Sequence, residues 1–188
     1  PSPCGRGEPR AVPPPASRGA ASRFPGDRLV AFPRRVAYTS RSEGRIGLEL
    51  RALVIGDIVG TRGRRVVQEK LAELRAREGA HLVIANAENL AGGSGVTPTL
   101  VEKLFKAGCD LLTLGDHAYG KRDGLPLIGS DQRIVRPLNY PEEAVGRGLT
   151  FLELPGEVTV ALLQVQGRVF MNPSDCPFRA ADKAVERA

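Results

Sequence analysis

The stretch Leu53-Val54-Ile55-Gly56-Asp57-Ile58-Val59-Gly60 decides the fold of this chain. It is a short apolar run that ends on a single acid between two glycines. A continuous apolar run of this length, bounded by glycine, predicts a buried strand that leads into a tight turn. In open α/β sheets, ligands bind outside the carboxyl ends of the strands, so Asp57 is a candidate site residue. The alternative role for Asp57 is to cap the helix that follows.

From Arg51 onward, strand patterns alternate with helical patterns. Glycine ends each helical pattern, and Pro98 follows Thr97 in the order that is favoured at a helix start. Short connections between alternating strands and helices favour a parallel sheet with right-handed crossovers. The predicted order is a strand at 52–55, a helix capped by Thr61 and ended by Gly79, a strand at 81–85, a helix from Thr97 to Gly108, and a strand at 110–114.

The alternation weakens after residue 120. Turn-forming residues dominate 120–150, and three further strands are predicted at 151–154, 158–165 and 168–170. The first two of these are joined by Pro155-Gly156-Glu157, which predicts a hairpin. Either the sheet grows here or a second sheet begins. One short helical pattern follows within 175–188.

Charge is distributed unevenly along the 188 residues. Residues 1–50 hold nine Arg against four acids, so this segment carries +5 of the total charge of +6. It also holds eight of the 15 prolines and almost no periodic apolar pattern, which predicts a disordered extension. We interpret it as sequence upstream of the true start or as a tail without function, with an organelle transit peptide as the alternative. Residues 51–188 then form the folded domain.

Partners and compartment follow from the same composition. No Lys/Arg cluster follows residue 51, so a nucleic-acid surface is not indicated. Three widely spaced cysteines, Cys4, Cys109 and Cys176, fit neither a disulfide framework nor a structural zinc site and favour a cytoplasmic location. No apolar run approaches the roughly 18 residues of a membrane span. The oligomeric state is left open.

Polar side chains follow all three strands of the predicted parallel sheet. Asp57 follows the first, Glu88 and Asn89 follow the second, and Asp116 and His117 follow the third. Each alone could be a cap or a turn residue. Together at one edge they would repel one another unless a cation lay among them. Oxygen ligands beside an imidazole suit Mn, Fe or Zn, and a pair of such ions can hold a phosphoryl group and activate water. This pattern predicts metal-assisted phosphoester hydrolysis.

The two histidines are assigned different roles. His117 follows Gly-Asp at a strand end, where solvent access and negative neighbours favour a proton donor to a leaving oxygen. His81 begins its strand at the opposite edge and is predicted to be structural.

Three further features border the predicted site. The loop 91–95 resembles a phosphate cradle but has neither the Walker Lys nor the GxGxxG order, so it is predicted to be a mobile loop beside the site. Arg147 and Arg168 lie in turn or edge positions, where a guanidinium could meet a substrate phosphate. A solvated surface position is the default for both.

Five motifs together resemble one known family. They read RALVIGDIVGTRGRR at 51–65, VIANAENLAGGSGVTP at 83–98, LTLGDHAYGKRD at 112–123, RPLNYP at 136–141 and LLQVQGRVFMNPSDCPFRAAD at 162–182. The chain from residue 51 to about 182 resembles the YmdB-like metallophosphoesterases, a branch of the calcineurin-like phosphoesterase superfamily.

That resemblance implies a metallophosphoesterase-type β-sandwich flanked by helices and a centre of two divalent metal ions, usually iron or manganese. It implies a hydrolase, a phosphodiesterase that acts on cyclic nucleotides such as 2′,3′-cyclic mononucleotides. By the same resemblance, Asp57 and Asp116 each ligate one metal and Glu88 bridges the pair. Asn89 touches a metal or the substrate phosphate, and His117 protonates the leaving group.

The chain departs from the family pattern in two ways. Position 116 is Asn in the family, and Asp116 adds a negative charge that would weaken the Lewis acidity of the metals. The family also completes its site with a further His and a His-x-His motif, which this chain lacks. We therefore expect a truncated enzyme, with 51–188 as the N-terminal part of the domain and little activity alone.

Two alternatives remain. One is a non-catalytic nucleotide-binding or regulatory α/β module that keeps the sheet without holding two metals. The other is a dinucleotide-binding dehydrogenase domain in which Glu88 reads a ribose. It ranks last, because Gly56, Gly60 and Gly63 do not reproduce the dinucleotide fingerprint.

Overall fold

The computed structural model describes residues 36–38 and 49–186, all of which belong to the unit Pro33–Ala188. Their main element is a five-stranded sheet in which four strands run parallel and the edge strand β1 runs antiparallel to β2. In sheet order, the strands are β1 (Val36–Tyr38), β2 (Leu50–Ile55), β3 (Leu82–Asn86), β4 (Leu111–Thr113) and β5 (Ile134–Val135).

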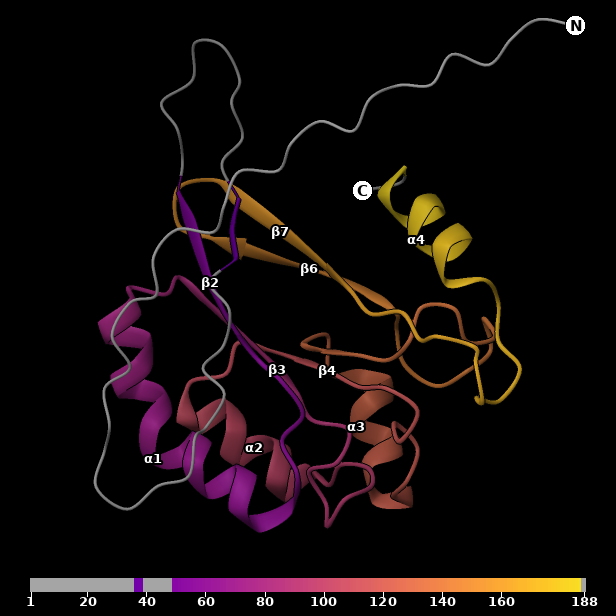
Figure 1. The fold of residues 1–188 in the computed structure, drawn as a ribbon, viewed down its shortest axis with the longest axis horizontal. Helices are drawn as coiled ribbons and strands as arrows, with labels where there is room; N and C mark the ends of the chain where they lie inside the picture. The colour runs from indigo at the N-terminus through magenta and orange to yellow at the C-terminus, as the bar shows by residue number, and fades with distance from the viewer. Residues whose placement is uncertain (1–35, 39–48, 187–188) are drawn as a thin grey trace, which may run out of the picture. The chain divides into compact units, whose positions relative to one another are not determined.

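Two helices connect the first three parallel strands. α1 (Gly60–Glu78) and α2 (Pro98–Ala107) lie next to each other on one side of the sheet (Figure 1). Each helix ends at a glycine in the left-handed region, with φ of 58° at Gly79 and 109° at Gly108. Glycine adopts this conformation without the penalty that a Cβ brings. These stops return the chain to the start of the next strand.

The hydrophobic core lies between these helices and the sheet. Both helices turn apolar side chains inward at helical spacing, and the strands meet them with fully buried aliphatic residues. Burial on this scale is the main favourable term in folding. The core includes Val67, Leu71, Val83, Ala85, Val101, Leu104, Leu112, Leu114, Ile128 and Ile134.

The remaining elements are shorter. A 3-10 turn, η1 (Arg122–Gly124), leads into α3 (Leu125–Ser130), and α4 (Pro177–Val185) closes the described part of the chain. β6 (Leu149–Leu154) and β7 (Val158–Leu163) form a separate antiparallel two-stranded sheet. Isolated bridges, Val135 with Arg147 and Pro137 with Gln164, connect this region to the residues after β4.

The predicted fold class is confirmed: an α/β protein with a parallel sheet, a second sheet and flanking helices. Two local predictions are wrong. Thr61 does not cap α1, because the helix begins at Gly60 and the Thr61 hydroxyl accepts a hydrogen bond from Arg64 Nη2 at 2.9 Å. Residues 168–170 form a turn instead of a strand, since Phe170 has a φ of 60° and Met171 N–H bonds to Arg168 O.

The predicted disordered extension, residues 1–50, is only partly described. Val36–Tyr38 forms β1, so the prediction is wrong for these three residues, because they pair with β2 over Leu50–Ala52. Leu50 itself begins β2, one residue before the predicted boundary. The rest of the extension, up to residue 48, lies outside the described residues. Within the described ranges, no helix is long and apolar enough to cross a membrane.

Candidate metal centre

The loops that follow β2, β3 and β4 meet at one edge of the sheet. Because β3 pairs in parallel with both neighbours, the carboxyl ends of all three strands point the same way. Backbone hydrogen bonds join the loops. Ile58 N–H donates to Asn86 O at 3.0 Å, and Ala87 N–H donates to Thr113 O at 2.9 Å. The side chains of these loops are therefore held at fixed positions relative to one another.

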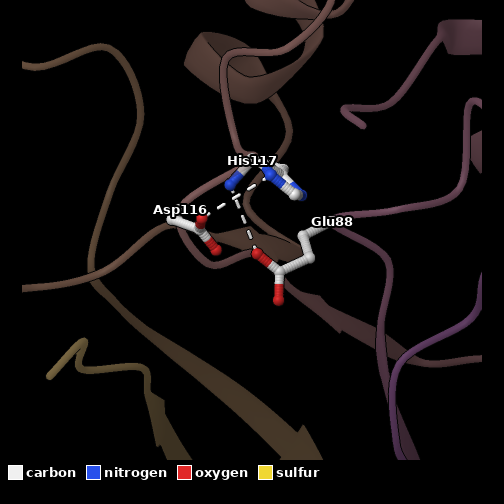
Figure 2. A group of neighbouring side chains, drawn as sticks. All are labelled: Glu88, Asp116 and His117. Atoms are coloured by element: carbon white, nitrogen blue, oxygen red, sulfur yellow. Dashed lines mark hydrogen bonds and ion pairs between the residues drawn. The ribbon is translucent and has the colours of Figure 1, made fainter. Parts of the chain in front are cut away.

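Glu88, Asp116 and His117 form a tight cluster at this edge (Figure 2). One potential ligand atom from each residue lies within 4.8 Å of the other two. The backbone N–H of His117 donates to Glu88 Oε2 at 3.3 Å, and His117 Nε2 lies 3.6 Å from Asp116 Oδ2. Glu88 is partly buried, whereas Asp116 and His117 are exposed. Two carboxylates beside one imidazole form a donor set that suits a divalent metal ion.

Asn89 connects this cluster to Asp57. Its Nδ2 donates to Asp57 Oδ2 at 2.7 Å, and its Oδ1 lies 2.5 Å from His117 Nδ1. All five residues predicted for the site from the sequence are thus neighbours in one hydrogen-bonded and ionic network.

The same network determines which nitrogen of His117 carries a proton. An ionised Asp57 only accepts hydrogen bonds, so the Asn89 group that faces it must be the NH₂. The Asn89 carbonyl then faces His117 and also only accepts, which places a proton on His117 Nδ1. His117 Nε2 is left facing Asp116 and the solvent.

Two residues that position Glu88 were missed by the sequence analysis. Asn86 Oδ1 accepts from Glu88 N–H at 3.1 Å, and Asn86 Nδ2 donates to Glu88 Oε1 at 3.3 Å. Gly115 lies against the same carboxylate, where a Cβ would overlap the Glu88 oxygens. The spacing Asn86-x-Glu88 was the available signal for the first contact, because Asn commonly bonds the backbone two residues ahead. No sequence signal indicated that Gly115 approaches Glu88.

Tyr140 was also missed, although it lies in the motif 136–141. Its hydroxyl donates to Gln166 Oε1 at 2.7 Å and lies 3.4 Å from Gly115 O. Burial raises the pKa of the Tyr140 hydroxyl, and the negative charge of Asp116 raises it further. Tyr140 is therefore a neutral hydrogen-bond donor at physiological pH.

Other sequence candidates lie away from this network. His81 is at the amino end of β3, where its Nδ1 accepts from Arg51 N–H at 3.1 Å, in line with the predicted structural role. Arg147 and Arg168 are absent from the pocket that Asp116 and His117 line, whereas Ser94 of the loop 91–95 belongs to it. The loop therefore borders the site, as predicted.

These observations define an α/β protein with a candidate metal centre at the carboxyl edge of its parallel sheet. The chain belongs to the YmdB-like protein family, whose model matches residues 53–188.

One curated relative is the 2′,3′-cyclic-nucleotide 2′-phosphodiesterase of Bacillus subtilis (strain 168), which is 37% identical over 139 residues. Those residues make up 74% of this chain and 52% of the relative. A crystal structure of a hypothetical protein from Thermus thermophilus matches with a TM-score of 0.69 and 42% identity, covering 74% of this chain and 54% of that one.

A crystal structure described as a novel phosphatase from Mycoplasma pneumoniae also matches with a TM-score of 0.69, at 26% identity. The match covers 73% of this chain and 51% of the Mycoplasma protein. The chain thus spans about half the length of each of these three proteins.

Proposed function

We propose that this chain is part of a metal-dependent phosphodiesterase that hydrolyses 2′,3′-cyclic nucleotides at a two-metal centre. The observation that carries the proposal is the convergence of Asp57, Glu88, Asn89, Asp116 and His117 in one network at the carboxyl edge of the sheet. The family match and the printed name of the Bacillus subtilis relative support the reaction class and the substrate.

The donor set fits the implied metals. Carboxylate oxygens from Asp57, Glu88 and Asp116, with the Asn89 amide oxygen, would hold two Mn or Fe ions, with Zn as the third choice. When bound, such ions would supply activated water and neutralise charge on the phosphate. The partly buried Glu88 is held in place by Asn86 and by the His117 backbone N–H, and its carboxylate would be the one that the two ions share.

His117 is assigned the role of general acid. Asn89 fixes its ring through Nδ1, so Nε2 is the atom that would deliver a proton to the leaving oxygen. The same nitrogen lies 3.6 Å from Asp116 Oδ2.

Weak activity is expected from the 188-residue chain by itself. It contains only two His, and His81 lies at the other edge of the sheet. We propose that residues 51–188 correspond to part of a metallophosphoesterase domain, with residues 1–50 as an extension. A non-catalytic nucleotide-binding module is the second candidate, and the shortage of imidazole ligands is what favours it.

Calorimetric titration separates the two candidates. Binding of 2′,3′-cyclic AMP would be measured with saturating Mn²⁺ and again with excess EDTA. Binding that requires Mn²⁺ supports the phosphodiesterase, whereas binding of equal strength in EDTA supports the module. Turnover of 2′,3′-cyclic AMP is measured in parallel, and strong Mn²⁺-dependent turnover would contradict the expected weak activity of this chain.

A further inference from the structure

A pocket of about 420 Å³ opens beside the candidate metal centre, and two of its residues belong to both. This volume falls within the range of small-molecule sites, roughly 300–1,000 Å³. The pocket collects residues from four separate segments of the chain. Its lining consists of Ser94, Asp116, His117, Tyr119, Gly120, Tyr140, Pro141, Asn172 and Pro173.

Two tyrosine rings form the aromatic part of this lining. The ring centroids of Tyr119 and Tyr140 are 6.1 Å apart, with the planes tilted by 48°. Both hydroxyls already donate to the protein, Tyr119 to Val145 O and Tyr140 to Gln166 Oε1, each at 2.7 Å. The rings are therefore held in place, and they present their apolar faces to a ligand more readily than their hydroxyls.

The pocket also contains polar side chains that form no hydrogen bond with the described part of the protein. Within residues 49–186, neither the Ser94 hydroxyl nor the Asn172 amide has a hydrogen-bond partner, although both line the pocket. A hydroxyl and an amide supply both donors and acceptors. A ligand with an aromatic face and a polar edge matches this combination.

A buried polar residue fixes the wall that carries Asn172. Asn139 is 1% exposed, and the two hydrogens of its Nδ2 are shared among Gln166 O, Ser174 Oγ and Asp175 O, which lie 2.9, 3.2 and 3.0 Å away. Its Oδ1 accepts from Gln166 N–H at 2.9 Å. The segment 166–175 is thereby held against the Tyr140 loop, so both walls of the pocket are organised before a ligand arrives.

We propose that this pocket is the nucleobase subsite. The base stacks on the ring face of Tyr140 beside Tyr119, and Ser94 and Asn172 contact its polar edge. The inference rests on the proposed function, because the phosphate of the same ligand would lie at the adjoining Asp116 and His117. It adds that the base itself contributes to binding, so a sugar phosphate without a base is a poor ligand.

The chain allows a direct test. It has no Trp and three Tyr, two of which line this pocket, so tyrosine emission reports on base stacking there. The probes are adenosine 5′-monophosphate and ribose 5-phosphate, which share the sugar and the position of the phosphate, so that only the first carries a base. Each is titrated into the full chain with saturating Mn²⁺ and with excess EDTA, by fluorescence and calorimetry.

The adenosine nucleotide is expected to quench tyrosine emission and to bind at least about fivefold more tightly than ribose 5-phosphate, in keeping with the usual contribution of a stacked base. Tyr140→Leu should abolish this preference, whereas Tyr140→Phe, which keeps the ring, should retain it. Asn172→Ala should reduce the preference without changing the thermal midpoint, because Asn172 is exposed. Asn172→Ala therefore remains informative even if Tyr140→Leu fails to fold.

Equal affinity for the two probes, or no binding of either, would overturn the nucleobase subsite. So would a preference that survives in both Tyr140→Leu and Asn172→Ala. The chelator distinguishes this failure from failure of the proposed function. Mn²⁺-dependent binding of both probes without a base preference leaves the metal centre standing and removes the subsite. A base preference accompanied by binding of equal strength in EDTA and in Mn²⁺ supports the subsite and counts against the metal-dependent phosphodiesterase.

Discussion

Asn89 is the residue on which the geometry of the candidate site depends. It donates to the Asp57 carboxylate from one end of its amide and accepts from His117 at the other, so one short side chain sets the positions of a proposed metal ligand and a proposed acid. An Asp at position 89 would lose the donor and set a second carboxylate against Asp57. This contact therefore needs the neutral amide that the chain has there.

Gly115 provides a test of how Glu88 is positioned. In Gly115→Ala, the new methyl group would overlap the Glu88 carboxylate and push it out of the cluster. We expect Mn²⁺ affinity to fall by about tenfold or more, as for other residues that orient metal ligands. The matched control is Gly56→Ala, at the same edge of the sheet, where a Cβ meets nothing within 4 Å. Calorimetric Mn²⁺ titration of both variants checks this, and equal affinities would refute the positioning role.

The cysteines Cys109 and Cys176 are expected to differ strongly in reactivity. Burial raises the pKa of the Cys109 thiol to about 12, so roughly one molecule in ten thousand carries its thiolate at pH 8. Hydrogen bonding from the Arg179 backbone lowers the pKa of Cys176, which is partly exposed at the start of α4. Iodoacetamide should therefore modify Cys176 at least about a hundredfold faster than Cys109.

Peptide mass spectrometry over a time course at pH 8 measures the two rates separately from that of Cys4. The difference should disappear in concentrated urea, where burial no longer distinguishes the two thiols. Similar rates in the folded protein would contradict the burial of Cys109.

At the scale of elements, α1 shows which contacts stabilise the sheet-and-helix core. Leu71 is 1% exposed, whereas Val66 is 45% exposed on the same helix. Leu71→Ala should lower the free energy of unfolding by about 2–5 kcal/mol, through lost burial and the cavity left behind. Val66→Ala should change it by about 0.5 kcal/mol or less. Urea unfolding followed by circular dichroism measures both, and comparable losses would mean that α1 packs through a different face.

The sequence predicted elements well where periodicity and glycine agree. The strand before Gly56 and the helices that end at Gly79 and Gly108 form where they were expected, because apolar spacing and left-handed glycines act locally. The strand predicted at 168–170 failed for the opposite reason. Its residues have strand propensity, but Phe170 adopts a positive φ, which residue type alone does not indicate. Likewise, β1 forms by pairing with β2, and no local sequence pattern predicted that contact.

At the scale of the whole molecule, the candidate site follows from the parallel sheet. Three strands that point the same way bring Asp57, Glu88 and Asp116 to one edge, so their proximity could be predicted from the strand pattern. The pocket beside them could not be predicted, because Tyr140 and Asn172 reach it through irregular loops. Those loops are joined by the buried contacts of Asn139, which leave no periodic signal in the sequence.

Metal binding should also be visible in the stability of the whole chain. A ligand that binds only the folded state stabilises it, by about 2.7 kcal/mol at a concentration of one hundred times its Kd. Mn²⁺ should therefore raise the thermal midpoint of the chain, and EDTA should reverse the increase. A midpoint that does not respond to Mn²⁺ would mean that the folded state gains no binding energy from the ion.

Mn²⁺ titration of Glu88→Gln beside the unchanged chain tests directly whether a metal centre lies at this edge of the sheet. Glu88→Gln keeps the size of the side chain and removes the negative charge of the carboxylate that is proposed to bind both ions. Glu153→Gln, an exposed acid on β6, is the matched control. We expect Glu88→Gln to lower Mn²⁺ affinity by about tenfold or more and Glu153→Gln to leave it unchanged. Equal Mn²⁺ affinity in all three proteins would contradict a metal centre at this edge of the sheet.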